Sequence, residues 1–161
     1  SGKISFDYVL DAGPTPLHGF CPLEIGVRRL PVADTTKYYI EQRVGKWKAS
    51  VGGAYANGWM KAQIRTLGTF SVQIDTVAPR ITPLGRGTWR TDRRIRFRVS
   101  DTQTGIASYK VYVDGEFVLF GLKKGMLVIQ DPERIKKGIP HRLEVIVKDG
   151  CGNEARKEYE F

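Results

Sequence analysis

The chain has 161 residues, 41% of them hydrophobic, and a formal net charge of +9. This is enough for one large or two small domains and too apolar for wholesale disorder. No apolar run approaches the roughly 20 residues that cross a bilayer, and no secretory signal pattern opens the chain. The positive charge favours polyanionic partners, but it does not choose among nucleic acid, lipid head groups and acidic wall polymers.

The first half of the sequence predicts short strands separated by turn residues. Apolar and polar residues alternate in 3–10 through Ile4, Phe6 and Tyr8, which predicts a strand. Gly45-Lys46 predicts a tight turn that pairs residues 47–49 back onto the preceding strand. The remaining strands are expected at the following ranges: 23–27, 37–44, 59–64 and 70–74. No helical periodicity persists over ten residues.

A proline-punctuated segment, residues 75–83, divides the chain. Pro79 and Pro83 fix their own φ and push the preceding residue away from helical conformation, so the segment is expected to be extended and stiff. This suits a joint between two β-domains better than a loop inside one. The predicted fold class is therefore all-β, with two tandem β-sandwich modules at 1–77 and 78–161.

The second half has the clearer strand pattern. In residues 94–99, Ile95, Phe97 and Val99 are expected inward and Arg94, Arg96 and Arg98 outward. Asp114-Gly115 predicts a hairpin turn. Other strands are expected at 143–147 and 155–161, and the one helical turn at 131–135. About seven short strands at this spacing predict an immunoglobulin-like sandwich.

Several motifs together resemble one family over almost the whole chain. They are Pro16-Leu17-His18, residues 51–59, residues 65–70, residues 75–84, residues 114–120 and the closing residues 147–153. This combination resembles the C-terminal region of large lysostaphin-like zinc peptidases from Gram-negative bacteria. The last of these motifs also looks like the final hairpin of bacterial immunoglobulin-like modules.

The resemblance implies a cell-envelope protein, periplasmic or associated with the outer membrane, in which this tandem accompanies an upstream peptidase domain. The family's zinc ligands lie in His-x-x-x-Asp and His-x-His patterns, and neither pattern occurs here. No catalytic residue of the family can therefore be placed on this sequence. Ser1-Gly2, in place of an initiating Met, likewise predicts a piece of a longer protein.

Metal and nucleophilic chemistry have weak support in the residues themselves. His18 and His141 are the two histidines, and with Cys21 and Cys151 they have no metal-ligand spacing. We expect no metal centre, no cofactor, no catalytic residue, two free thiols, and a surface or edge position for His141.

Asp75, Asp101 and Asp149 each follow a predicted strand. Carboxylates at one pole of a sandwich can bind Ca²⁺. The alternative, which we favour, is that each accepts hydrogen bonds from backbone N–H groups in its own turn.

The densest basic run contains Arg86, Arg90 and Arg93 and continues into the strand of Arg94, Arg96 and Arg98. Alternate side chains on a strand lie about 6.5–7 Å apart, so the strand could line up along a phosphate polymer or acidic glycan. The alternative, which we favour, is an edge strand protected by charge. With no helix for a groove and no interleaved aromatics, nucleic acid is not expected.

Three tryptophans raise the question of a sugar-stacking surface. Trp59 is expected in the first core, whereas Trp89, among polar residues, is the better candidate for an exposed ring. The ligand-binding residues predicted from sequence are therefore Trp89, Arg94, Arg96 and Arg98. The functions expected are a noncatalytic spacer, orienter or docking region for an envelope peptidase, with peptidoglycan or an envelope protein as partner, or alternatively a carbohydrate-binding module.

Overall fold

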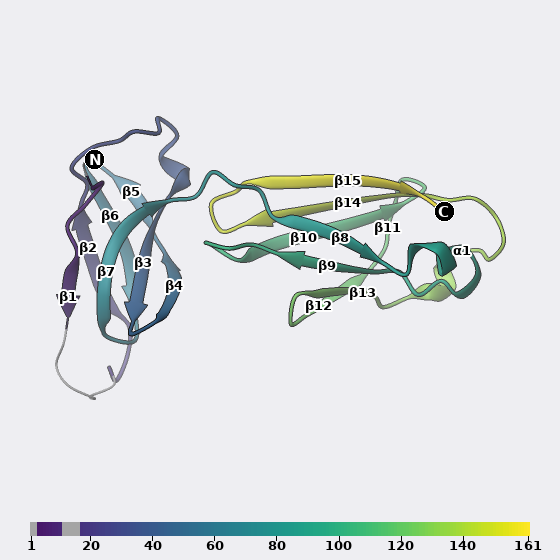
Figure 1. Ribbon diagram of the computed structural model, residues 1–161, viewed down its shortest axis with the longest axis horizontal. Helices are drawn as coiled ribbons and strands as arrows, with labels where there is room; N and C mark the ends of the chain where they lie inside the picture. The colour runs from purple at the N-terminus through teal and green to yellow at the C-terminus, as the bar shows by residue number, and fades with distance from the viewer. Residues whose placement is uncertain (1–2, 11–16) are drawn as a thin grey trace. The chain divides into compact units, whose positions relative to one another are not determined.

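The computed structural model describes residues 3–10 and 17–161, which form an all-β chain (Figure 1). It divides into two compact units, 1–76 and 77–161; the sequence placed the boundary after Val77. Pro16, one of the residues quoted for the family resemblance, and Ser1-Gly2 lie outside the described residues.

The first unit is a sandwich of two antiparallel sheets, in the orders β1-β7-β3-β4 and β2-β6-β5. The strands are β1 (Tyr8–Leu10), β2 (Cys21–Gly26), β3 (Tyr38–Val44), β4 (Trp47–Gly52), β5 (Ala54–Ala56), β6 (Trp59–Ile64) and β7 (Gly68–Ile74), with a 3₁₀ turn η1 at Thr35–Lys37. Ile25 and Met60 of one sheet pack with Ile40, Phe70 and Val72 of the other to form the core. This inter-sheet core is what holds the two sheets face to face.

The predicted Gly45-Lys46 turn is present, because Val44 pairs with Trp47 across it and Gly45 has φ +57°. The first predicted strand is shorter than expected and begins only at Tyr8. Phe6, one of the alternating apolar residues, precedes β1 and is 56% exposed, and the guanidinium of Arg28 lies over its ring, 4.4 Å from the ring centroid.

The second unit is also a sandwich, in the orders β12-β13-β9-β8 and β11-β10-β14-β15. The strands are β8 (Arg80–Leu84), β9 (Arg96–Ser100), β10 (Ile106–Val113), β11 (Glu116–Phe117), β12 (Phe120–Lys123), β13 (Met126–Ile129), β14 (Arg142–Asp149) and β15 (Glu154–Glu160). Phe97, Leu127, Val145 and Trp89 are among the fully buried residues of the core between them.

Backbone handedness explains the hairpin turns of this unit. Asp114 and Gly115 both have positive φ, as a type I′ turn requires, and Val113 pairs with Glu116 across them. Lys124 and Gly125 form a second turn of this kind, between β12 and β13, which the sequence reading missed.

Helical structure is slightly richer than expected. The predicted turn is the 3₁₀ segment η3 (Pro132–Arg134), with Asp131 at its N-cap position. Two more short pieces, η2 (Arg86–Thr88) and α1 (Trp89–Asp92), lie between β8 and β9.

Pro83 belongs to β8, and not to the connecting segment as expected. A proline lacks the N–H of a ladder hydrogen bond, and β8 lies at the end of its sheet, where that loss is tolerated.

Candidate functional site

The outer face of the β12-β13-β9-β8 sheet is the strongest candidate for a functional surface. As predicted, Ile95, Phe97 and Val99 are buried, whereas Arg94, Arg96 and Arg98 are exposed. The register fixes the neighbours: Arg96 lies between Leu84 and Val128, and Arg98 between Thr82 and Met126. Arg96 and Arg98 therefore each have neighbours with aliphatic, thioether or hydroxyl side chains on the two adjacent strands. We call this surface, formed by Thr82, Leu84, Arg94, Arg96, Arg98, Lys123, Met126 and Val128, the arginine face.

No acidic residue occurs in the four strands of this sheet. In the part of the chain that the structure describes, Arg94, Arg96, Arg98 and Lys123 form no ion pair within 4.0 Å. The other sheet of the same unit differs: Arg142 pairs with Glu158 at 2.6 Å and Arg156 with Glu144 at 3.1 Å. The four strands of the arginine face thus carry an excess of positive charge, partly offset at one end by Asp92 beside Arg94 and Arg96. The positive charge of the opposite sheet is neutralised by ion pairs within that sheet.

A cavity of about 360 Å³ opens at one end of the arginine face. Its wall consists of Gly85, Thr88, Asp92, Arg93, Arg94, Arg96, Val128, Ile129 and Pro132. The carboxylate of Asp92 is held at the rim by the N–H of Arg94 (2.8 Å) and the hydroxyl of Thr88 (2.8 Å). These two hydrogen bonds, and to a smaller extent the charges of Arg94 and Arg96, lower the pKa of Asp92.

Arg93 forms part of the cavity wall and has a structural role. It ends α1 in the left-handed conformation, with φ +58°, and its Nη1 donates to the carbonyl of Ile135 at 3.1 Å. Its Nε is buried and has no hydrogen-bond partner in the structure. Arg86 is also engaged: it donates to the carbonyl of Glu160 and lies 5.1 Å from the Tyr159 ring. The basic run therefore divides into anchored arginines and the solvent-facing ones of the arginine face.

Two expectations about this region were wrong. Trp89, proposed as an exposed ring, is 0% exposed; its Nε1 donates to the carbonyl of Leu84 and its ring meets Phe97 edge-on at 5.2 Å. The polar residues next to Trp89 in the sequence suggested an exposed side chain, but the short helix α1 directs the Trp89 ring into the core. The strand of Arg96 and Arg98 is also no edge strand, because β9 lies between β13 and β8.

The tryptophans that reach solvent are in the first unit. Trp47 is 82% exposed beside the β3–β4 turn. Trp59, expected in the core, is 48% exposed and lies over Gly26 of the paired strand, where a β-carbon would sit 3.7 Å from the ring. An aromatic ring over a strand glycine replaces the packing that the glycine lacks, so the role of Trp59 is explained by the sheet.

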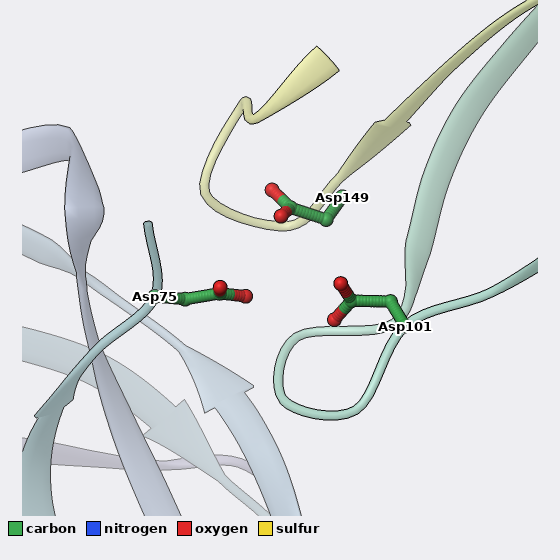
Figure 2. Close-up of side chains that lie close together, drawn as sticks. All are labelled: Asp75, Asp101 and Asp149. Carbon is green, nitrogen blue, oxygen red and sulfur yellow. The ribbon is translucent and has the colours of Figure 1, made fainter. Parts of the chain in front are cut away.

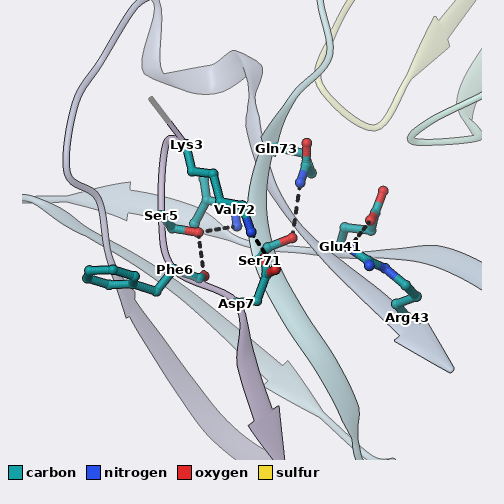
Figure 3. Close-up of polar contacts among 9 residues, drawn as sticks. All are labelled: Lys3, Ser5, Phe6, Asp7, Glu41, Arg43, Ser71, Val72 and Gln73. Carbon is teal, nitrogen blue, oxygen red and sulfur yellow. Dashed lines mark hydrogen bonds and ion pairs between the residues drawn. The ribbon is translucent and has the colours of Figure 1, made fainter. Parts of the chain in front are cut away.

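A polar cleft of about 360 Å³ lies on the first unit, and Lys3, Ser5, Asp7, Arg43 and Ser71 belong to its wall (Figure 3). The buried Ser5 hydroxyl accepts from the N–H of Val72 (2.8 Å) and donates to the carbonyl of Phe6 (2.9 Å). Both contacts are to backbone groups, so the Ser5 hydroxyl ties the segment that precedes β1 to β7.

Of the three acidic turn residues drawn in Figure 2, Asp101 and Asp149 behave as the favoured alternative predicted. One oxygen of Asp101 accepts from the N–H groups of Gln103, Thr104 and Gly105, at 2.8–3.1 Å. Asp149 is 2% exposed and accepts from the N–H of Cys151 and from both nitrogens of Asn153. Their carboxylates approach within 4.8 Å of each other. The hydrogen bonds within each turn explain why these aspartates are there. The third aspartate, Asp75, follows β7, and its backbone N–H donates to the carbonyl of Lys37.

His141 is buried, contrary to expectation. Its Nδ1 lies 2.6 Å from Asp114 Oδ2 and its Nε2 lies 2.7 Å from the carbonyl oxygen of Lys136. Both ring nitrogens are used in these contacts, so the ring fastens three segments together. Cys21 and Cys151 are free thiols, as expected; the first is exposed and the second buried.

Residues 1–75 match the sequence model of the Zu5-like domain. The first unit is similar to Zu5-like domains. The match covers less than half of the chain and does not include the second unit, which carries the arginine face. No curated protein matches the sequence. In the ranges that the structure describes, no helix is long and apolar enough to cross a membrane.

Proposed function

We propose that this chain is a noncatalytic accessory region of a cell-envelope peptidoglycan peptidase, and that it spaces, orients or docks the catalytic domain. The link to a peptidase rests on the sequence resemblance described above. The observation that supports a noncatalytic role is the use of the reactive side chains: His141, Asp101, Asp149 and Ser5 each hold backbone groups in place.

The topology of the second unit supports its assignment as immunoglobulin-like. We count β8 as the first strand of this unit and β15 as the eighth. In spatial order, one sheet then consists of strands one, two, six and five, and the other of strands four, three, seven and eight. This is the distribution of strands between the sheets of an immunoglobulin sandwich that has one extra strand beside its third. Such modules serve as rigid spacers and as binding platforms, which fits an accessory role.

Sugar stacking on Trp89 is not part of the proposal, because a fully buried ring cannot contact a ligand. Docking by charge remains, since the exposed cations of the arginine face suit the carboxylates of a wall polymer. The envelope location is proposed on the same resemblance.

Sedimentation with purified peptidoglycan sacculi tests the proposal. The whole chain is expected to sediment with sacculi and to release no soluble wall fragments from them. Release of fragments that a single substitution abolishes would make the chain an enzyme and overturn the noncatalytic role. Failure to sediment would remove docking and leave spacing and orientation.

A further inference from the structure

We infer that the arginine face binds an acidic polysaccharide through the outward row of Arg94, Arg96 and Arg98. The inference rests on the docking role proposed above and names the surface and the chemistry that would perform it. Three properties of the face carry it: the excess of positive charge on its strands, the spacing of its arginines, and the absence of aromatic side chains from its outward positions.

The charge is concentrated on one side of the second unit. The strands of the arginine face contain Arg80, Arg96, Arg98 and Lys123 and no Asp or Glu. In the opposite sheet, every strand except β10 contains acidic residues. An edge strand could use such charge to avoid aggregation, but β9 is an interior strand and needs no such protection. A row of solvent-facing guanidinium groups on an interior strand is therefore left without that structural explanation.

The spacing and the group chemistry favour an extended polyanion. Arg96 and Arg98 project the same way from alternate positions of β9, about 6.5–7 Å apart, and Arg94 continues the row toward the cavity. Guanidinium groups bind carboxylates through two parallel hydrogen bonds, a geometry that an ammonium group does not offer. A linear polymer with regularly spaced carboxylates can meet several of these groups at once.

The neutral groups on the face favour a glycan over a nucleic acid. Thr82 is exposed beside Arg98, and Gln130 lies over Gly121, where its amide nitrogen would be 2.9 Å from an added β-carbon. A hydroxyl and an amide among the cations suit a chain that carries hydroxyls as well as carboxylates. No aromatic side chain occupies an outward position on these strands, so single-stranded bases would find no stacking partner.

A membrane surface is a poorer match than a glycan. The aliphatic residues of the face, Leu84, Met126 and Val128, are half-buried between the strands and do not project as an anchor that enters a bilayer.

Affinity measurements with the whole chain and two matched double variants test the inference. Arg96→Gln with Arg98→Gln removes two charges from the face and keeps most of each stem. Arg142→Gln with Arg156→Gln removes two charges from the opposite sheet and is the control for net charge. The probes are polygalacturonate, neutral dextran, a thymidine oligonucleotide, vesicles with anionic lipid, and peptidoglycan sacculi; thermal unfolding establishes that both variants are folded.

The wild-type chain and the control are expected to bind polygalacturonate alike, whereas the face variant loses at least about five-fold in affinity. Binding is expected to weaken with added salt, because exposed charges are screened. Equal loss in both variants would overturn the inference, since net charge alone would then explain binding. Tighter binding to the oligonucleotide or to the vesicles than to polygalacturonate would also overturn it.

Sacculi separate this inference from the proposed function. If the chain sediments with sacculi and the face variant sediments equally well, the proposed docking is supported and the inference that the arginine face carries it is overturned. If polygalacturonate binding depends on Arg96 and Arg98 but sacculi are not bound, the inference about the arginine face is supported and the proposed docking to peptidoglycan is overturned.

Discussion

Asp114 and His141 are joined by a 2.6 Å contact between Oδ2 and Nδ1, although one is in a hairpin turn and the other precedes β14. The second oxygen of Asp114 accepts from the N–H of Arg142 at 2.9 Å. The imidazole also packs on Phe161, with ring centroids 5.3 Å apart. This pair therefore ties the β10–β11 turn to the start of β14 and to the end of the chain.

Asp114→Asn is expected to lower the free energy of unfolding by about 1 kcal/mol at neutral pH. The N–H of Arg142, followed by the hydrogen bond and charge of His141, holds the pKa of Asp114 below its usual value of 3.8. A lowered folded-state pKa stabilises the fold above pH 3.8 and loses that effect as the pH falls through the folded-state value. Asparagine tolerates the left-handed conformation of position 114, so the turn itself is kept.

Thermal unfolding across an acid pH series checks this prediction. The melting temperature of the wild type is expected to fall more steeply in acid than that of Asp114→Asn, so the two curves converge. Asp131→Asn is the control, because the Asp131 side chain makes no cap hydrogen bond. Parallel curves for wild type and Asp114→Asn would contradict a contribution from the ionised Asp114 carboxylate.

Trp89→Ala is expected to destabilise the second unit by about 3–5 kcal/mol, because it removes a large buried ring. The Trp89 ring also meets Tyr159 at 6.0 Å and Phe161 at 5.8 Å, both edge-on. Trp47→Ala, at an 82% exposed position, is expected to change stability by less than about 0.5 kcal/mol. Urea unfolding followed by circular dichroism compares the two.

A stable Trp89→Ala protein would contradict the burial of this ring. Trp89→Phe is the informative intermediate, since it keeps an aromatic ring and loses the hydrogen bond to the carbonyl of Leu84. It is expected to cost less than the alanine variant and more than Trp47→Ala.

Regular alternation made the outward arginines of β9 predictable from sequence. Ile95, Phe97 and Val99 recur at the two-residue period of a strand, and that period fixes which side chains face the core. The hairpin at Asp114-Gly115 was equally clear, because both positions need a positive φ.

What sequence could not give was the environment created by distant segments. The place of β9 inside its sheet depends on β13, which is 26 or more residues further along the chain. The burial of Trp89 depends on aromatic residues at the end of the chain, and that of His141 on Asp114 and the Lys136 carbonyl. Local polarity suggested exposure at both positions because these contacts leave no periodic signal.

Asp149→Asn is expected to destabilise the second unit by about 2–3 kcal/mol. The buried carboxylate receives one hydrogen bond from the Asn153 side-chain nitrogen at 2.7 Å. An amide at position 149 would either direct an NH₂ group at that nitrogen or turn it toward the N–H groups of Cys151 and Asn153. In both orientations two donors face each other in a buried site.

Urea unfolding measures this cost, and Asn153→Ala provides the comparison. Removing the Asn153 side chain loses its hydrogen bond to Asp149 and is expected to cost about 1 kcal/mol in addition to any packing loss. If Asp149→Asn were as stable as the wild type, the carboxylate would not be needed as the acceptor of this turn.

Gly68→Ala is expected to destabilise the first unit by about 1–3 kcal/mol, since an inserted methyl overpacks the β3–β7 pairing. A β-carbon at position 68 would lie 2.8 Å from the carbonyl oxygen of Arg43 and 3.1 Å from Cγ2 of Val44. The first of these is backbone of the neighbouring strand, so relief requires the strands to move apart. Gly19→Ala is the control, because a β-carbon there meets nothing within 4 Å.

Amide hydrogen exchange at Phe70 and Gln42, which pair in this ladder, is expected to accelerate in Gly68→Ala and to stay unchanged in Gly19→Ala. Unchanged exchange in both variants would mean that the ladder accommodates the methyl group without opening.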